Sequence, residues 1–331
     1  MKLSILDQAP VSSNQTAREA LEQSVLLAQT AERYGYTRYW IAEHHDMPGL
    51  ACPAPEVMLP YIGASTSRIR IGSGAVLLPH YKSYKVAEIY NMLATLFPDR
   101  VDIGIGRAPG GSAEVTNALS DHFLQNVWNM PETLKDLLHF IHNDHPAGSE
   151  LAKIKAAPLP EISPEPWLLG TSTKSALLAA EHGMAYAFGM FMSDKDAVEI
   201  VNLYKDSFQP GSIQSPKTIL AVSAICAETT EQAEEIALSS LCWSIQRKNG
   251  EGLTGVPSIA EAKDFILSAT EKEELKGMRE KMIIGNPADV KNRLLDLQKQ
   301  TKTDEIMIIT ITYSPQDRLN SYQLIAEELL E

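Results

Sequence analysis

The chain has 331 residues, 44% of them hydrophobic and 21% charged, and carries a formal net charge of -13. This is the composition of an ordinary globular protein, long enough for one large domain. The acidic balance argues against a nucleic-acid-binding surface and against binding to an anionic membrane, so we expect no nucleic acid and no membrane among its partners.

The cysteines and the apolar runs give an expectation about location. Cys52, Cys226 and Cys242 are odd in number and form no C-x-x-C pair, so no disulfide framework is indicated. The first residues lack the pattern of a signal peptide, and no apolar run approaches the ~20 residues of a membrane span. We therefore expect a cytoplasmic protein.

Strand-like and helix-like segments alternate along the whole chain. Strands are predicted over 3–6, 38–42, 69–76, 101–106, 166–170, 185–188, 219–227 and 305–310. Between them, apolar stripes at helical spacing, capping motifs such as Thr16-Ala17-Arg18-Glu19, and Pro or Gly stops predict helices. Eight strands alternating with helices predict an α/β fold of the (β/α)8 TIM barrel type.

One late segment departs from this alternation. Residues from about 242 to 282 are more polar and do not continue the alternation of predicted strands and helices. We interpret them as an insertion with some helix, and expect residues 1–331 to form one barrel domain that carries it.

The end of the second predicted strand is the first candidate site. The strand is aromatic and apolar, and it ends abruptly in Glu43, His44 and His45. Catalytic groups of such barrels sit at the carboxyl ends of the strands. Each histidine alone could be a packed residue, but burying three polar groups together is costly. The cluster therefore favours function.

Two kinds of chemistry compete for this barrel face. A metal-dependent hydrolase needs His, Asp or Glu ligands that converge from several strands. Here the good ligands cluster after the second strand, and only Asp7 lies elsewhere. This is a poor metal set, so we expect no metal.

A phosphate-bearing organic cofactor fits the strand ends better. Gly170-Thr171-Ser172 precedes a predicted helix and offers backbone N–H groups and hydroxyls to a phosphate. Arg107 can add a charge-assisted contact, and the glycines of strands three and four leave room for a flat ring. The alternatives are an ordinary helix N-cap for the turn and a surface ion pair for Arg107. The placement of the turn, Arg107 and the glycines together at the strand ends supports the cofactor.

Several motifs resemble those of the bacterial luciferase-like flavin-dependent monooxygenases. They occur in the right order over nearly the whole chain, at 39–45, 69–74, 100–110, 167–170 and 317–322. The resemblance implies a (β/α)8 barrel that uses reduced FMN, supplied by a separate flavin reductase, and O2 to oxygenate a small organic substrate. It also implies a homodimer packed through the helices after strands two and three. A non-catalytic flavin-binding protein and, less favoured, a metal-dependent hydrolase are the alternatives.

The resemblance also implies roles for single residues. His44 matches the active-site histidine beside the flavin, so it is the catalytic candidate. Arg107, Ser172 and Ser175 match phosphate-anchoring positions. The full set of expected cofactor-binding residues is Glu43, Ser73, Gly74, Gly106, Arg107, Gly170, Thr171, Ser172 and Ser175. We expect His44 in the largest pocket of the carboxyl face, with Arg107 on that face.

Two positions carry more specific expectations from the same resemblance. Gly106 stands where light-emitting luciferases have a cysteine, which puts light emission in doubt but not flavin use. The Gly74–Ala75 bond lies where the family often has a non-proline cis peptide. The alternative is a crowded strand end with every bond trans.

Overall fold

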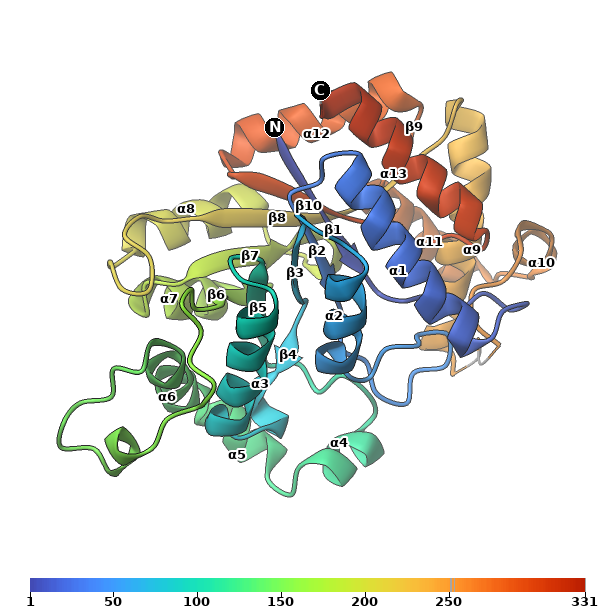
Figure 1. Cartoon of the computed structure of the whole chain (residues 1–331). Coiled ribbons are helices and arrows are strands. Elements are labelled where there is room, and N and C mark those ends of the chain that lie inside the picture. The colour runs from blue at the N-terminus through green and yellow to red at the C-terminus, as the bar shows by residue number, and fades with distance from the viewer. Residues whose placement is uncertain (251, 253, 331) are drawn as a thin grey trace.

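The structure is a computed structural model that describes residues 1–250, 252 and 254–330. In this part of the chain, eight parallel strands close into a barrel with helices outside it (Figure 1). In order around the barrel they are β1 (Lys2–Asp7), β2 (Arg38–Ile41), β3 (Arg70–Ser73), β5 (Val101–Gly106), β6 (Glu165–Gly170), β7 (Ala185–Gly189), β8 (Thr218–Cys226) and β10 (Glu305–Ile309). Ile306 of β10 pairs with both Leu3 and Leu220, which closes the ring. The predicted (β/α)8 TIM barrel is confirmed.

Two short strands extend this barrel. β4 (Val76–Leu77) follows β3 and pairs with β5, while β9 (Ile283–Gly285) pairs with the end of β8. The prediction of one continuous strand over 69–76 is wrong, because Gly74 and Ala75 separate β3 from β4. The peptide bond between them is cis, as the resemblance implied.

The helices surround the strands. Those that pack around the barrel are α1 (Ala17–Arg33), α2 (Pro55–Ala64), α3 (Ser83–Leu96), α6 (Met130–His142), α7 (Thr173–Glu181), α8 (Ala197–Ser207), α12 (Pro287–Thr301) and α13 (Pro315–Leu329). The loop after β5 carries α4 (Ala113–Leu119) and α5 (Phe123–Trp128). No helix within the described ranges is long and apolar enough to cross a membrane.

The late polar segment follows β8. It consists of the last turns of α9 (Thr230–Lys248), then α10 (Ile259–Asp264) and α11 (Ala269–Lys281). Helix α9 runs through residue 242, where the predicted insertion begins. The interpretation of 242–282 as an insertion in one domain stays a prediction.

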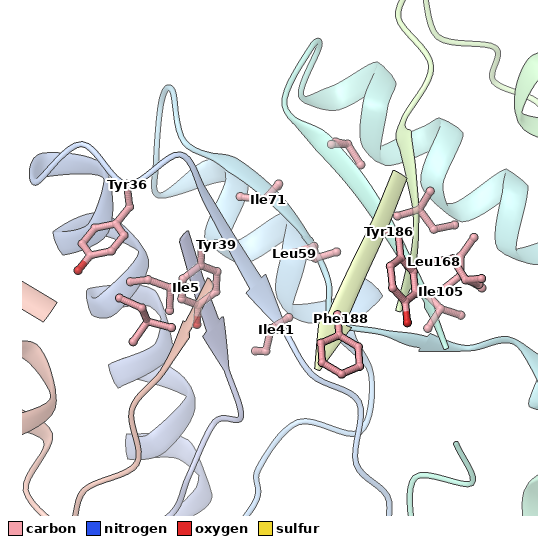
Figure 2. Close-up of a cluster of buried hydrophobic side chains, with 14 of the residues drawn as sticks. Ile5, Tyr36, Tyr39, Ile41, Leu59, Ile71, Ile105, Leu168, Tyr186 and Phe188 are labelled. Carbon is pink, nitrogen blue, oxygen red and sulfur yellow. The ribbon is translucent and has the colours of Figure 1, made fainter. Parts of the chain in front are cut away.

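The core has two layers separated by the strands. Tyr39 and Ile41 of β2 face the surrounding helices, in the cluster that Figure 2 shows with Leu59 and Ile71. Trp40, between them, faces the barrel interior with Leu6, Ala42 and Trp167 among others. Because neighbouring residues of a strand point to opposite faces, an apolar strand fills both layers at once.

Buried polar groups join the two ends of the chain. In α13, Arg318 donates from Nη1 to Oδ1 of Asp7 in β1 at 3.1 Å. Tyr39 donates to the other oxygen of the same carboxylate. In the same helix, the Tyr322 hydroxyl accepts from the Thr310 N–H at 3.0 Å. The 317–322 motif thus fixes the last helix to the barrel.

Candidate active site

The predicted site residues follow strands that are neighbours in the barrel. Ser73, Gly106 and Gly170 are the last residues of β3, β5 and β6, and His44 lies just after β2. Because all these strands are parallel, their carboxyl ends share one face of the barrel. The structure therefore brings the predicted catalytic and cofactor-binding residues to the same face.

Glu43 is held by three donors of the chain itself. Its carboxylate accepts from the Tyr81 hydroxyl at 2.6 Å, from Nε2 of His45 at 2.8 Å and from the Leu77 N–H at 3.1 Å. The residue is 4% exposed, so these bonds compensate for most of the hydration it loses. Glu43 thereby ties the loop that carries His44 to β4. A direct cofactor contact by Glu43 stays a prediction.

His44 is a half-buried imidazole with an unused ring nitrogen. Its Nδ1 is buried and finds no hydrogen-bond partner among the described residues. Burial, followed by the charges of Arg247 and His45, lowers the pKa of His44 to about 4. The ring is therefore neutral near pH 7, and its Nδ1 can take part in a hydrogen bond without carrying a charge.

Small residues line the ends of β3 and β5. A Cβ added at Gly74 would lie 2.4 Å from Cδ1 of Leu6, and one at Gly106 would lie 3.0 Å from Cβ of Ala75. A side chain at Gly74 would displace Leu6, whereas one at Gly106 would need only a small shift of Ala75. The Ser73 hydroxyl donates to the Gly104 carbonyl at 3.0 Å, so it already has a partner in the barrel wall.

The turn after β6 forms the capped start of α7. Ser172 is the N-cap residue, its hydroxyl accepts from the Ser175 N–H at 3.4 Å, and the Ser175 hydroxyl accepts from the Ser172 N–H at 3.2 Å. A Cβ at Gly170 would lie 2.2 Å from Oγ of Ser175. The ordinary N-cap interpretation is thus correct for this turn. The N-cap does not exclude an anion site, because the positive N-terminal end of α7 lies on the same barrel face as the other strand ends.

Arg107 is an exposed cation close to this helix end. Its charge acts on Tyr186, whose hydroxyl lies 3.0 Å from Oγ of Ser175. Burial raises the pKa of Tyr186 to about 12, and Ser175 and Arg107 act in the opposite direction. Within the described residues, Arg107 belongs to none of the ion pairs, which run from Arg18–Glu22 to Arg318–Asp7. The surface ion-pair alternative is therefore not supported.

The expectation about the pocket is not confirmed. One cavity of about 540 Å³ is lined by residues of α5, α6 and the turn before α3, including His80 and Tyr81. A second, of about 800 Å³, lies between the N-terminus and the end of α13. Neither is lined by His44 or Arg107. In the parts of the chain described, no three His, Cys, Asp or Glu side chains are placed to hold a metal ion.

Sequence reasoning missed two residues next to this site. Tyr81 follows β4. Its place after the third predicted strand is the only signal in the sequence that could have indicated a position near the site. Arg247 lies at the end of α9, more than 200 positions from His44. No local pattern indicates a contact over such a separation.

Comparison with known proteins decides the family. A family model described as luciferase-like monooxygenase matches residues 1–304. The chain belongs to the luciferase-like monooxygenase family. The resemblance seen in the sequence is thereby confirmed, and membership supports an oxygenase.

Individual members of the family match nearly end to end. The N-acetyl-S-alkylcysteine monooxygenase of Bacillus subtilis (strain 168) is 35% identical over 332 residues, covering 100% of this chain and 98% of the relative. The crystal structure of apo-MsnO8 is 34% identical, covers 99% of this chain and 97% of that one, and has a TM-score of 0.89. The oxygenating constituent of 3,6-diketocamphane monooxygenase from Pseudomonas putida, in complex with FMN, shares the fold at 17% identity and a TM-score of 0.72, with 99% and 97% of the two chains covered.

Proposed function

We propose that this protein is an FMN-dependent monooxygenase that uses reduced FMN and O2 to oxygenate a small organic substrate. One observation carries the proposal. The exposed guanidinium of Arg107 lies close to the start of α7 on the same barrel face as the neutral imidazole of His44. A cation at a helix N-terminus suits a phosphate, and a neutral histidine can donate or accept a hydrogen bond at pH 7.

The residues present fit FMN. Arg107 would bind the phosphate, together with Thr171, Ser172 and the backbone at the start of α7. Gly74 and Gly106 would let a flat ring approach the backbone, because neither carries a side chain. The orphaned Nδ1 of His44 offers a hydrogen-bonding atom on that side. Reduced FMN would supply the electrons that activate O2.

The barrel itself would contribute by excluding water. The interior beneath the site is filled by buried apolar side chains, including Leu6, Trp40 and Ala42. His44 would form a hydrogen bond with the substrate at Nδ1, and its low pKa keeps the ring neutral at neutral pH. Loss of water from such a site strengthens every polar interaction within it.

The proposed partners are a flavin reductase, O2, a small substrate and a second copy of the chain. The likeness to an oxygenating constituent that binds FMN supports a separate reductase. Helices α2 and α3 pack together and expose Val57 (67%), Tyr61 (53%), Met92 (49%) and Leu96 (58%), which supports a homodimer through this face. The cytoplasmic location stays a proposal, consistent with three buried free cysteines.

The proposal is tested in two steps. Oxidised and reduced FMN are titrated into the protein, and binding is followed by flavin fluorescence. The protein is then incubated with a flavin reductase, isotope-labelled O2 and a substrate screen that begins with N-acetyl-S-butylcysteine, after the relative described above. We expect FMN binding and a product that contains one labelled oxygen. FMN binding without any oxygenated product would indicate a flavin carrier, and no FMN binding would overturn the proposal.

A further inference from the structure

Arg247 presents a fixed cation at the rim of the site. Its guanidinium carbon lies 4.7 Å from the centroid of the Trp243 ring, one helical turn earlier in α9. Its Nη2 donates to Sδ of Met47 at 3.2 Å, a weak acceptor. Trp243 is 1% exposed, so the ring supports the guanidinium from below while Arg247 itself stays exposed.

The end of α9 is packed directly on the loop that carries His44. A Cβ at Gly49 would lie 2.6 Å from Cζ2 of Trp243, so the indole touches the loop backbone. The same loop is closed by the His44 N–H, which donates to the Cys52 carbonyl at 3.0 Å. The position of Arg247 relative to His44 is therefore set by packing, and its charge helps to lower the pKa of His44.

Arg247 belongs to none of the ion pairs between described residues. The chain carries 42 acidic residues against 29 Lys and Arg, yet no carboxylate of the described ranges pairs with Arg247. The next residue, Lys248, pairs with Glu274 at 2.6 Å. A cation placed beside a histidine disfavours protonation of that histidine, and an anionic ligand beside Arg247 would be stabilised by its charge.

This cation is separate from the one assigned to the cofactor. Arg107 follows β5 and lies near α7, whereas Arg247 lies over the loop after β2, two strands away in the order β2-β3-β5. An arginine held flat on an aromatic ring offers paired N–H donors that match a planar carboxylate. The side beside His44 is where a substrate meets the catalytic candidate.

We propose that Arg247 binds a carboxylate group of the substrate and determines specificity for anionic substrates. This inference rests on the proposed function, because it takes the His44 side of the barrel mouth as the substrate side. It assigns the substrate to the class of small organic acids, with the carboxylate on Arg247 and the reacting atom toward His44.

The test compares an acid with its uncharged analogue. Binding of N-acetyl-S-butylcysteine and of its primary amide is measured by calorimetry, with and without FMN, for the wild-type protein, Arg247→Met and Arg247→Lys. Lys248→Met is the matched control, since it removes the same charge one residue away from the site. We expect the acid to bind the wild-type protein about tenfold more tightly than the amide, as for a charged hydrogen bond. Arg247→Met should remove this difference, Arg247→Lys should reduce it, and Lys248→Met should leave it.

Several results would overturn the inference. They are equal binding of acid and amide, no binding of the acid by the wild-type protein, and unchanged preference in Arg247→Met. Loss of FMN affinity in Arg247→Met would also overturn it, because Arg247 would then serve the cofactor. Failure of the wild-type protein to bind FMN would instead reject the proposed function. The preference for the acid measured without FMN would still test Arg247 in that case.

Discussion

The guanidinium of Arg38 in β2 donates from Nη1 to Oδ2 of Asp102 in β5 at 2.7 Å, across the intervening strand β3. Burial acts to raise the pKa of Asp102, but Arg38 and Arg70 outweigh it and hold that pKa below its ordinary value. Arg38 also donates to Glu305 at 2.8 Å. Both buried carboxylates therefore pair with Arg38, and Asp102 pairs with Arg70 as well.

Arg38→Met should therefore be strongly destabilising. It leaves Asp102 and Glu305 buried with one cation fewer, which costs about 3–5 kcal/mol in comparable cases. The free energy of unfolding in urea measures the loss. In the wild-type protein the depressed pKa of Asp102 contributes stability above the unfolded value of 3.8, and this is lost as pH falls through the folded value. In the variant the carboxylates can protonate more readily, so the difference between the proteins should shrink in acid.

The control for this prediction is Arg18→Met. Arg18 forms an exposed pair with Glu22 one turn along α1, and water screens such pairs so that they contribute little to stability. A loss in Arg38→Met no larger than that of the control would show that the buried network contributes little.

The bond between Tyr81 and Glu43 makes a second prediction. Tyr81→Phe removes the hydroxyl that donates to the buried Glu43 carboxylate at 2.6 Å. We expect a loss of about 1.5–3 kcal/mol in unfolding free energy, as for a hydrogen bond to a charged group. Tyr61→Phe, at a residue that is 53% exposed, is the control and should change little. Equal stability of the two variants would argue against the view that Glu43 holds the His44 loop against β4.

Variants of Arg107 and His44 should affect different steps, one the binding of FMN and the other the oxygenation of the substrate. Arg107→Ala should weaken FMN binding by about 1.5–3 kcal/mol, because a charged contact to the phosphate is lost. His44→Ala should leave FMN affinity largely intact and slow oxygenation. Flavin titration and labelled-oxygen turnover, measured on both variants, decide between the two roles. The reverse pattern would exchange the assignments.

The sequence predicted the barrel because its strands are buried on both sides. Segments such as 39–42 are aromatic and apolar without interruption, which is typical of a parallel strand between an inner and an outer layer. The strand ends could then be placed on one face by topology alone, and this brought His44, Arg107 and Gly170 together. The end of β3 at Ser73 was not predicted, because the small residues after it gave no signal that would divide the predicted strand 69–76.

Contacts between distant segments could not be predicted in the same way. Glu43 was identified from its neighbours in the chain, but its partner Tyr81 comes from a different loop. Arg247 of α9 contacts the loop that carries His44. It lies within residues 242–282, which the alternation of strands and helices does not explain. Such contacts depend on how helices pack on the barrel, which a pattern of residues along one strand does not specify.

The homodimer leads to a fourth prediction. Leu59, Ile62, Val86 and Leu93 are buried against their own barrel, so these apolar residues of α2 and α3 do not need a partner. Val57 and Leu96 are 67% and 58% exposed, and the proposed dimer would cover them. Val57→Asp should therefore lower the mass measured by light scattering at micromolar concentration from dimer to monomer. Leu124→Asp, at a position of α5 that is 82% exposed, is the control. A monomeric wild-type protein would argue against the dimer.

The last prediction follows from the low pKa of His44. Burial is its largest cause, followed by the charges of Arg247 and His45, and together they lower it from 6.5 to about 4. Between these values the unfolded chain binds a proton that the folded chain does not, so the stability of the folded state falls as pH decreases through this range. The difference between the two pKa values corresponds to a loss of about 3 kcal/mol, complete below about pH 4. His44→Asn should remove this part of the acid sensitivity, whereas His122→Asn, at an exposed histidine, should not. Urea unfolding of the three proteins from roughly pH 3.5 to pH 8, a range that includes both pKa values, measures this loss. Parallel curves for wild-type and His44→Asn would contradict a neutral His44.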